Sequence, residues 1–250
     1  MSVYRAARLA LAKRWPWPVR ARLRSGRRMY VDLRSGIGRG IFVTGEFDPV
    51  VFDPIRAALR PGGTFLDVGA NVGFYSMLAL DVVGPTGAVH AFEIDPRPLR
   101  CLRKTIDRER IANLTLHAVA VGRTNGTARL VRRQDSGHTG LAGEGSGTPV
   151  SVVTLDSWWR SSAIQSVQAI KIDIEGGEPA AIEGARELLR ATRPVIVCEA
   201  DDALLGTTNR SVAGLVALLT SMGYRTRPLD GVWSPTIVAA PDDATSQVGG

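Results

Sequence analysis

The chain has 250 residues, of which 44% are hydrophobic and 22% are charged, a composition that excludes a disordered protein and allows one sizeable core. Its formal net charge is +7, yet the first 40 residues hold eleven Arg and Lys side chains against one acid. The remaining residues hold 20 basic and 23 acidic side chains, so the body is slightly acidic. This distribution disfavours nucleic-acid binding by the body and confines the excess positive charge to the N-terminal segment.

The N-terminal segment, residues 1–45, is predicted to form a basic arm followed by lead-in strands. Arg alternates with Ala, Leu and Val up to Trp15-Pro16-Trp17-Pro18, where the prolines end any helix. Two short strands are expected at 29–33 and 40–44, around a cluster of glycines. Either the arm packs on the domain as a solvated basic face, or it is attracted to an anionic membrane or acidic acceptor. In the second case Leu9, Leu11, Trp15 and Trp17 form its apolar side.

Residues 46–242 show a regular alternation of apolar strands and helical segments, followed by a polar tail, 243–250, that is expected to be frayed. Asp95 and Pro96 are typical of the start of a helix, and Ser211 of another. The alternation predicts a mostly parallel α/β sheet of seven strands, with helices on both faces and an antiparallel C-terminal strand pair. The predicted strands are 64–68, 88–93, 114–121, 128–132, 150–154, 169–174, 194–199, 224–229 and 236–240. The predicted helices are 50–60, 73–83, 96–108, 179–190 and 211–222.

No run of about 18 apolar residues and no signal-peptide pattern occurs, so neither a transmembrane helix nor a cleaved leader is predicted. Cys101 and Cys198 lie in apolar stretches, as buried reduced thiols do. We therefore expect a cytoplasmic protein, which the basic arm would place at the inner face of the membrane.

The strongest local motif is the strand that ends in Asp67-Val68-Gly69-Ala70-Asn71-Val72-Gly73 and leads into a helix. Its glycines let a ligand approach the backbone, and the helix N-terminus offers free N–H donors. Because the spacing is not Gly-x-Gly-x-x-Gly, a nicotinamide dinucleotide is disfavoured. Asp67 suits a positive ammonium or sulfonium group, and Glu93, at the tip of the next strand, suits ribose hydroxyls. The pair favours S-adenosylmethionine; alternatively Asp67 caps the turn and Glu93 is a solvated strand end.

At this point the sequence resembles the FkbM-type methyltransferase family, S-adenosylmethionine-dependent O-methyltransferases of bacterial secondary metabolism and glycan decoration. The resemblance covers roughly residues 40–200, and the Arg-rich N-terminal segment is outside it. It is carried by Gly45-Glu46-Phe47, the Asp67 to Gly73 motif, Ala91-Phe92-Glu93-Ile94-Asp95, Ala118-Val119-Ala120, Thr154-Leu155-Asp156, Lys171-Ile172-Asp173-Ile174-Glu175-Gly176-Gly177-Glu178 and Arg193-Pro194. The family commonly has Pro at the position of Ile94 and Ala at that of Gly177.

The resemblance implies a Rossmann-like class I methyltransferase fold. The residues that we expect to bind the cofactor are Glu46, Asp67, Gly69, Asn71, Gly73, Phe74, Ser76, Glu93, Ile94 and Ala118.

Methyl transfer to a hydroxyl requires either a base or a metal ion that lowers the pKa of the hydroxyl. Asp173 and Glu175 follow one predicted strand, and Glu199 and Asp201 follow the next, so the two acidic groups should be neighbours at the carboxyl edge. Carboxylate oxygens are ligands that Mg²⁺ prefers, which predicts a metal site formed by Asp173, Glu199 and Asp201. In the metal-free alternative Asp173 is the base or orients the cofactor. Glu175 is a further candidate catalytic residue beside Asp173. The alternative, that Glu175 and Glu178 only cap the helix that begins near Pro179, is credible for Glu178.

A histidine in the polar loop 134–148 is the other candidate base. His138 has an imidazole that titrates near neutral pH, and its loop could close over the site as a lid. Alternatively it is a solvated loop residue. His90 and His117 lie in predicted strands and are expected to serve packing.

These observations favour O-methylation of a hydroxyl on a sugar, a glycolipid or polysaccharide, or a related natural product. The rival is an RNA or other nucleic-acid methyltransferase that uses the basic arm, but the sequence lacks the Asn/Asp-Pro-Pro-aromatic motif typical of base methylation. A third class is a binding protein that has lost activity. No pattern in the sequence identifies the acceptor, and none shows whether the chain forms a homodimer.

Overall fold

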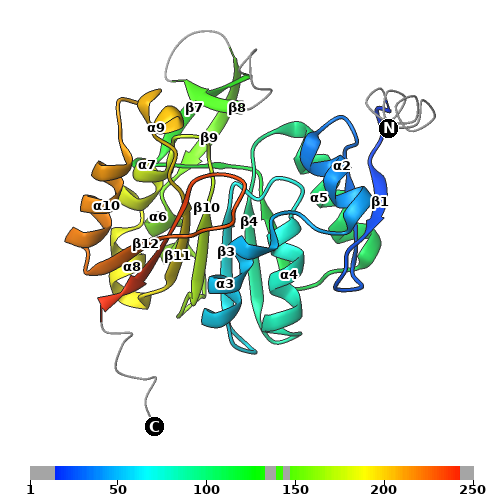
Figure 1. Cartoon of the computed structure of the whole chain (residues 1–250), viewed down its shortest axis with the longest axis horizontal. Coiled ribbons are helices and arrows are strands. Elements are labelled where there is room, and N and C mark those ends of the chain that lie inside the picture. Colours follow the sequence, from blue (N-terminus) through cyan, green and yellow to red (C-terminus); the bar gives the residue numbers. More distant parts are fainter. Residues whose placement is uncertain (1–14, 133–138, 143–146, 243–250) are drawn as a thin grey trace.

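The computed structural model describes residues 15–132, 139–142 and 147–242. Its centre is a seven-stranded sheet of order β12-β13-β11-β10-β3-β4-β5 (Figure 1). The strands are β3 (Thr64–Val68), β4 (Ala88–Phe92), β5 (Leu114–His117), β10 (Ala169–Ile172), β11 (Val195–Glu199), β12 (Tyr224–Pro228) and β13 (Thr236–Pro241). Only β13 pairs antiparallel, with β11 on one side and β12 on the other. The predicted mostly parallel α/β fold is confirmed.

Two apolar cores cover the two faces of this sheet. Successive residues of a strand alternate between them, so Phe65 packs in one core and Leu66 in the other. The first core contains α3 (Phe52–Ala58), α4 (Phe74–Val83) and α5 (Pro96–Glu109). The second contains α6 (Leu155–Ser161), α7 (Glu178–Glu183), α8 (Arg186–Thr192) and α10 (Val212–Ser221). Each fully buried Leu, Met or Phe side chain contributes about 1.5–3 kcal/mol to such a core.

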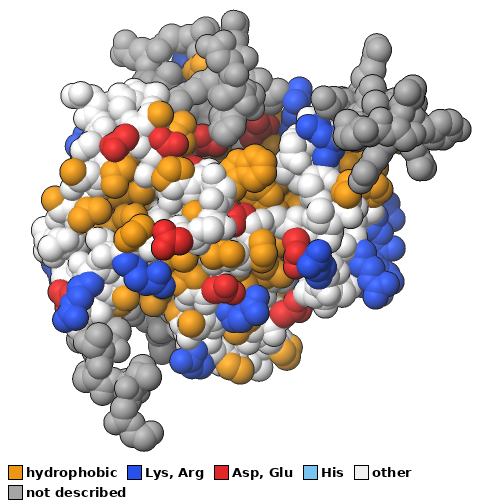
Figure 2. Space-filling view, in the orientation of Figure 1, with side chains coloured by type: hydrophobic (Ala, Val, Ile, Leu, Met, Phe, Trp, Pro, Cys, Tyr) orange, Lys and Arg blue, Asp and Glu red, His pale blue; other side chains and the backbone are white. Residues whose placement is uncertain are grey.

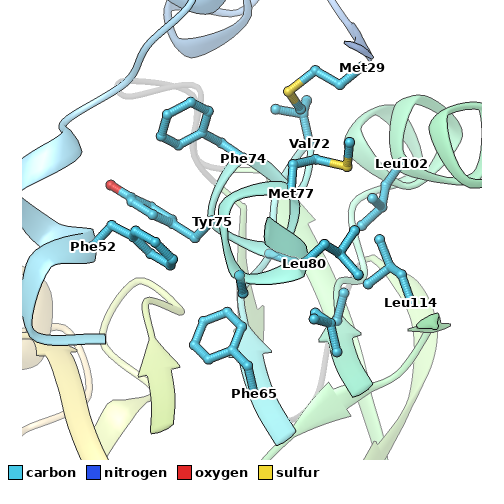
Figure 3. Packing of buried hydrophobic residues seen from close by; sticks show 14 of the residues in the cluster. Met29, Phe52, Phe65, Val72, Phe74, Tyr75, Met77, Leu80, Leu102 and Leu114 are labelled. Atoms are coloured by element: carbon cyan, nitrogen blue, oxygen red, sulfur yellow. The ribbon is translucent and has the colours of Figure 1, made fainter. Parts of the chain in front are cut away.

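In the first core, α4 is surrounded on several sides (Figure 3). Phe65 packs from the sheet, Phe52 from α3, Leu102 from α5 and Met29 from the lead-in, and all four are almost completely buried. The helix is therefore fixed in the interior, and the turn that precedes it is held in place from behind.

The predicted helix starts at Asp95 and Ser211 are confirmed. The Asp95 carboxylate accepts a hydrogen bond from the Arg97 N–H at 2.8 Å, with Pro96 in the first turn. The Ser211 hydroxyl accepts one from the Gly214 N–H at 3.2 Å. Such caps satisfy N–H groups that have no partner within the helix.

The lead-in differs from the prediction. Residues 40–44 belong to α2 (Gly36–Thr44) rather than to a strand, because the Ser35 hydroxyl caps the Gly38 N–H and Gly45 ends the helix at φ +73°. These caps outweigh the β propensity of the Ile-Phe-Val-Thr run. The hairpin is formed instead by β1 (Val19–Arg22), which was not predicted, and β2 (Arg28–Val31). The hairpin buries Met29 and Val31 in the first core, so the described lead-in is part of the packed body.

The predicted strand 114–121 is divided between two sheets. It leaves the central sheet after His117, and Ala120–Val121 (β6) joins a four-stranded sheet of order β6-β9-β7-β8. The predicted extra strands are confirmed as the antiparallel pair of β7 (Gly126–Arg132) and β9 (Thr148–Val153). Part of the loop predicted between them is β8 (Thr139–Ala142), which pairs with β7.

The predicted helix 179–190 is interrupted between α7 and α8. A Cβ atom at Gly184 would lie 2.1 Å from the Gly122 carbonyl oxygen, so the chain passes very close to another backbone there. Asp156 then starts the second helix, because its carboxylate accepts hydrogen bonds from the Glu187 and Leu188 N–H groups. Two further helices, α6 (Leu155–Ser161) and α9 (Asp202–Gly206), were not predicted, and the predicted helix 50–60 begins with a short 3₁₀ turn, η1 (Pro49–Val51). In the described ranges, no helix combines the length and apolar character needed to cross a bilayer.

Candidate active site

The turn after β3 lies directly against the end of β10. Gly69 has φ +79°, and a Cβ atom there would lie 1.8 Å from the Asp173 carbonyl oxygen. Gly73 has φ +85°, and a Cβ atom there would lie 2.5 Å from Leu102. Asn71 adopts φ +50° between them. Both glycines are therefore required by positive φ and by close approach, and the turn brings the tips of two neighbouring strands together.

Asp67 and Ser76 lie beneath this turn and are fully buried. The Asp67 Oδ2 atom accepts hydrogen bonds from the Ser76 N–H at 3.0 Å and from its hydroxyl at 2.6 Å, while Oδ1 has no hydrogen-bond partner in the described part of the chain. Burial raises the pKa of Asp67, although the nearby Lys171 opposes this. These two predicted cofactor residues thus support the turn from inside, and Oδ1 is the atom that could accept from a ligand.

Glu93 is held rigidly at the tip of β4. Its Oε2 atom accepts from the Asn71 N–H at 2.7 Å, and Oε1 accepts from the N–H groups of Ile94 and Asp95, each at 2.7 Å. Burial raises the pKa of Glu93 to about 7 against the effect of these hydrogen bonds. The alternative of a solvated strand end is wrong. Each oxygen can accept a further bond, as ribose hydroxyls would require.

The other predicted cofactor residues are distributed around this turn. Ala118 is exposed just after β5, next to Glu93, whose N–H donates to the His117 carbonyl at 3.1 Å. Phe74 is buried and contacts Phe47 and Tyr75 edge-on. Glu46 forms an ion pair with Arg24 of the lead-in at 2.9 Å. Thus Gly69, Asn71, Glu93, Ile94 and Ala118 are brought together, whereas Glu46 is bonded to the lead-in.

Lys171, a residue that the sequence analysis missed, lies at the centre of the charged groups. It is 5% exposed, pairs in register with Asp67, and donates to the Asp173 Oδ2 atom at 2.9 Å. Its ammonium group also lies 4.9 Å from the centre of the Tyr75 ring. Burial alone would lower the pKa of Lys171, but the charges of Asp173 and Asp67 and the hydrogen bond to Asp173 raise it. A lysine between two isoleucines of a buried strand, two residues before an aspartate, was the available signal.

Asp173 and Glu199 are in contact at the tips of β10 and β11. The Asp173 side chain is 39% exposed, whereas Glu199 is largely buried and its Oε2 atom lacks a hydrogen-bond partner among the described residues. Burial first, and then the charges of Asp173, Glu175 and Glu178, raise the pKa of Glu199 to about 9. This surrounding favours the protonated form of Glu199 beside the Asp173 carboxylate.

Glu178 fixes the loop between Asp173 and α7. Its carboxylate accepts from the Ile174 N–H at 2.8 Å and from the Gly176 N–H at 3.0 Å. Burial raises the pKa of Glu178 to about 7. Within this loop Glu175, a predicted catalytic residue, is half-buried at φ +59°. Glu178 thus does more than cap a helix, because it holds the backbone that carries Asp173 and Glu175.

The three carboxylates predicted to bind Mg²⁺ each have a partner within the protein. Asp201 caps α9 by accepting from the Ala203 N–H at 2.7 Å, Asp173 is paired with Lys171, and Glu199 lies against Asp173. The described residues contain no group of three or more His, Cys, Asp or Glu side chains arranged for a metal ion. The Mg²⁺ site formed by Asp173, Glu199 and Asp201 therefore stays a prediction.

Of the three histidines, His138 lies outside the described residues, so its predicted role as a base stays a prediction. His90 and His117 pack as expected. The His90 Nδ1 and His117 Nε2 atoms lie 3.1 Å apart, both rings contact Trp158, and the His117 ring stacks on Phe92.

The raised pKa of Glu199 predicts a pH-dependent effect of Glu199→Gln on stability. Between about pH 4.5 and pH 9 the folded protein holds a proton that the unfolded chain releases, so wild-type stability falls as the pH rises. The variant keeps an N–H donor for Asp173 but cannot ionise. We expect its free energy of unfolding to increase relative to wild type from about pH 5 to about pH 9, measured by urea denaturation. A constant difference across this range, or the same trend in the exposed control Asp230→Asn, would contradict it.

Comparison with known proteins gives a consistent result. The family model described as the methyltransferase FkbM domain matches residues 67–226. The 31-O-demethyl-FK506 methyltransferase FkbM of Streptomyces tacrolimicus is 27% identical over 199 residues, which cover 66% of this chain and 74% of that protein. The crystal structure of methyltransferase FkbM from Methylobacillus flagellatus KT has a TM-score of 0.53 at 19% identity and shares its fold. That match covers 80% of this chain but 52% of the other, so this chain spans about half of that protein's length.

Proposed function

This chain belongs to the FkbM family of S-adenosylmethionine-dependent methyltransferases, and on that premise we propose that it methylates a hydroxyl oxygen. The proposed acceptor is a sugar, a glycolipid or polysaccharide, or a related natural product. The observation that carries the proposal is the partly exposed Asp173 carboxylate, which accepts a hydrogen bond from the buried Lys171 ammonium at 2.9 Å and lies against Glu199 of the next strand. The name of the Streptomyces relative, which specifies a 31-O-demethyl substrate, supports oxygen as the acceptor atom.

The residues around the turn after β3 fit S-adenosylmethionine. Bound there, this cofactor supplies an electrophilic sulfonium methyl group. Glu93 offers fixed carboxylate oxygens for the ribose hydroxyls, and Asp67 keeps one buried oxygen for a donor. The carboxylates of Asp67 and Asp173 flank the meeting point of β3 and β10, where they favour a positively charged ligand.

Asp173 acts as the base in this proposal. Lys171 orients the carboxylate by donating to its Oδ2 atom, and Glu199 lies against it at the tip of the neighbouring strand. The Asp173 carboxylate would take the hydroxyl proton as the acceptor oxygen is methylated, and S-adenosylmethionine, held by Glu93 and the turn after β3, would supply the methyl group and leave as S-adenosylhomocysteine. A positioned base of this kind contributes about 10²–10⁴-fold in rate.

The test is S-adenosylhomocysteine release with a panel of free sugars, oligosaccharides, glycolipids and polyketides, followed by mass analysis of the product. We expect one class of hydroxyl acceptor to give turnover above the acceptor-free background, with the methyl group on oxygen. Turnover should persist in EDTA, because the three carboxylates predicted as ligands have protein partners. A methyl group found on nitrogen or on RNA, or loss of turnover in EDTA that Mg²⁺ restores, would contradict this proposal.

A further inference from the structure

Helix α5 presents a row of cations outside the active site. Arg97, Arg100, Arg103 and Arg108 are exposed, and none of them forms an ion pair with another described residue. An open groove of about 600 Å³ runs along the helix and is lined in part by Arg100, Arg103 and Arg108. Since like charges in a row repel one another, a surface of this kind is stabilised by an anionic partner.

The hairpin beside α5 extends this basic surface. Arg22 and Arg28 are exposed and face each other across the β1–β2 pair. Arg20 is bonded to Glu109 at the end of α5, which joins the hairpin to the helix. Lys and Arg side chains gather along this edge of the molecule in the space-filling view (Figure 2). The cations of α5 and of the hairpin are together called the α5 face below.

Exposed apolar side chains border the α5 face. Trp15 is 51% exposed and Trp17 61%, and the Arg100 side chain fixes this segment by donating to the Pro16 carbonyl and lying over the Trp17 ring. Phe42 and Val43 are exposed on α2, which contacts both strands of the hairpin. Of the five large hydrophobic side chains exposed in the described ranges, four therefore belong to the lead-in. Trp and Phe beside Arg are typical of segments that rest at the headgroup level of a membrane.

We propose that the α5 face binds the anionic surface of a phospholipid membrane, with Trp15, Trp17, Phe42 and Val43 entering the headgroup layer. The charge is complementary to such a surface, and residues 1–14 add Arg5, Arg8, Lys13 and Arg14 in sequence. The apolar Val43 and Phe42 gain from contact with lipid and gain nothing from a phosphate backbone, which favours a membrane over nucleic acid.

The position of the α5 face also bears on the substrate class. Helix α5 begins at Pro96, directly after the Glu93 tip of β4, so the basic surface starts at the rim of the candidate site. A membrane held there places lipid-borne groups beside the site. This inference rests on the proposed function, and it narrows the expected acceptor to a hydroxyl of a saccharide that is carried on a lipid.

The test is co-sedimentation of the full chain with vesicles of phosphatidylcholine alone or mixed with phosphatidylglycerol, at low and high salt. Wild type should sediment with the anionic vesicles at low salt only. The triple variant Arg100→Glu, Arg103→Glu, Arg108→Glu should partition at least about tenfold more weakly. The matched control Arg186→Glu, Arg190→Glu, Arg227→Glu changes the charge equally on α8 and β12, at the opposite edge of the sheet (Figure 1), and should bind as wild type does.

Three results would overturn the proposal: no sedimentation of wild type, equal losses in the two triple variants, or binding to fluorescent single-stranded RNA that depends on the α5 face while vesicle binding does not. Trp17→Ser provides a second variant, which should weaken binding to the anionic vesicles at low salt without changing the net charge. S-adenosylmethionine binding, measured by calorimetry without vesicles, should be the same in both triple variants. If the protein binds vesicles but methylates no hydroxyl acceptor, the proposed function is wrong and the membrane-binding surface stands. If it methylates a hydroxyl but does not bind vesicles, the membrane-binding surface is wrong and the proposed function stands.

Discussion

Replacing Asp173 by Asn is expected to lower kcat by about 10²–10⁴-fold while leaving the affinity for S-adenosylmethionine within about threefold of wild type. The amide keeps the size of the side chain and can accept from Lys171, but it cannot take a proton from the acceptor hydroxyl. The readouts are S-adenosylhomocysteine release under saturating acceptor and cofactor binding by calorimetry.

The control for this experiment is Asp230→Asn, an exposed carboxylate in the loop between β12 and β13, which should retain wild-type kcat. Glu199→Gln distinguishes base from support, because it should keep much of kcat and shift its pH profile. Turnover of Asp173→Asn within about fivefold of wild type would reject Asp173 as the base and would direct attention to His138.

Replacing Lys171 by Met is expected to destabilise the fold by about 3–5 kcal/mol at neutral pH. The buried ammonium group donates to the Asp173 carboxylate, and its charge favours the ionised form of Asp67 on the neighbouring strand, so its removal leaves the fully buried Asp67 without that compensation. Methionine fills a similar volume, so the effect reports the lost charge more than a cavity. Urea denaturation at neutral pH measures the loss.

Two comparisons make this result specific. Lys104→Met removes a lysine from the surface of α5, where it lies over the Tyr30 ring, and should cost about 1 kcal/mol or less. Adding Asp67→Asn to Lys171→Met should restore part of the stability, because the unpaired charge is then absent. Equal costs for Lys171→Met and Lys104→Met would show that the buried ion pair is not a stabilising element.

The central sheet could be predicted because its signals are local. Strand β3 and helix α4 are separated by a turn whose glycines and Asn71 are required by backbone geometry, so the pattern fixes both the turn and its neighbours. The lead-in could not be predicted as well. The caps at Ser35 and Gly45 compete with a β-branched run, and the pairing of β1 with β2 depends on burial against α5, which is a tertiary effect.

In the candidate site, too, residues with a local signal could be predicted and those that depend on tertiary contacts could not. Glu93 was identifiable because an acid at a strand tip has few structural roles. Lys171 was not identified, because a lysine enters a core only when partners from other strands compensate its charge, and Asp67 is more than 100 positions away in sequence. The cap that Asp201 forms on the short helix α9 was not predicted, because that helix was not predicted either. Where the role of a side chain depends on the fold, the residue type alone does not identify that role.

The lead-in hairpin is bonded into the same core as the cofactor turn, and Met29 packs beside Val72 and Met77 (Figure 3). A protein that binds a membrane through this hairpin therefore holds its active site at a fixed height and tilt, whereas a flexible linker would not. Its active site would reach only hydroxyl groups within a narrow range of distances from the lipid headgroups. Acceptors whose hydroxyl lies closer to the membrane or farther from it would not be methylated.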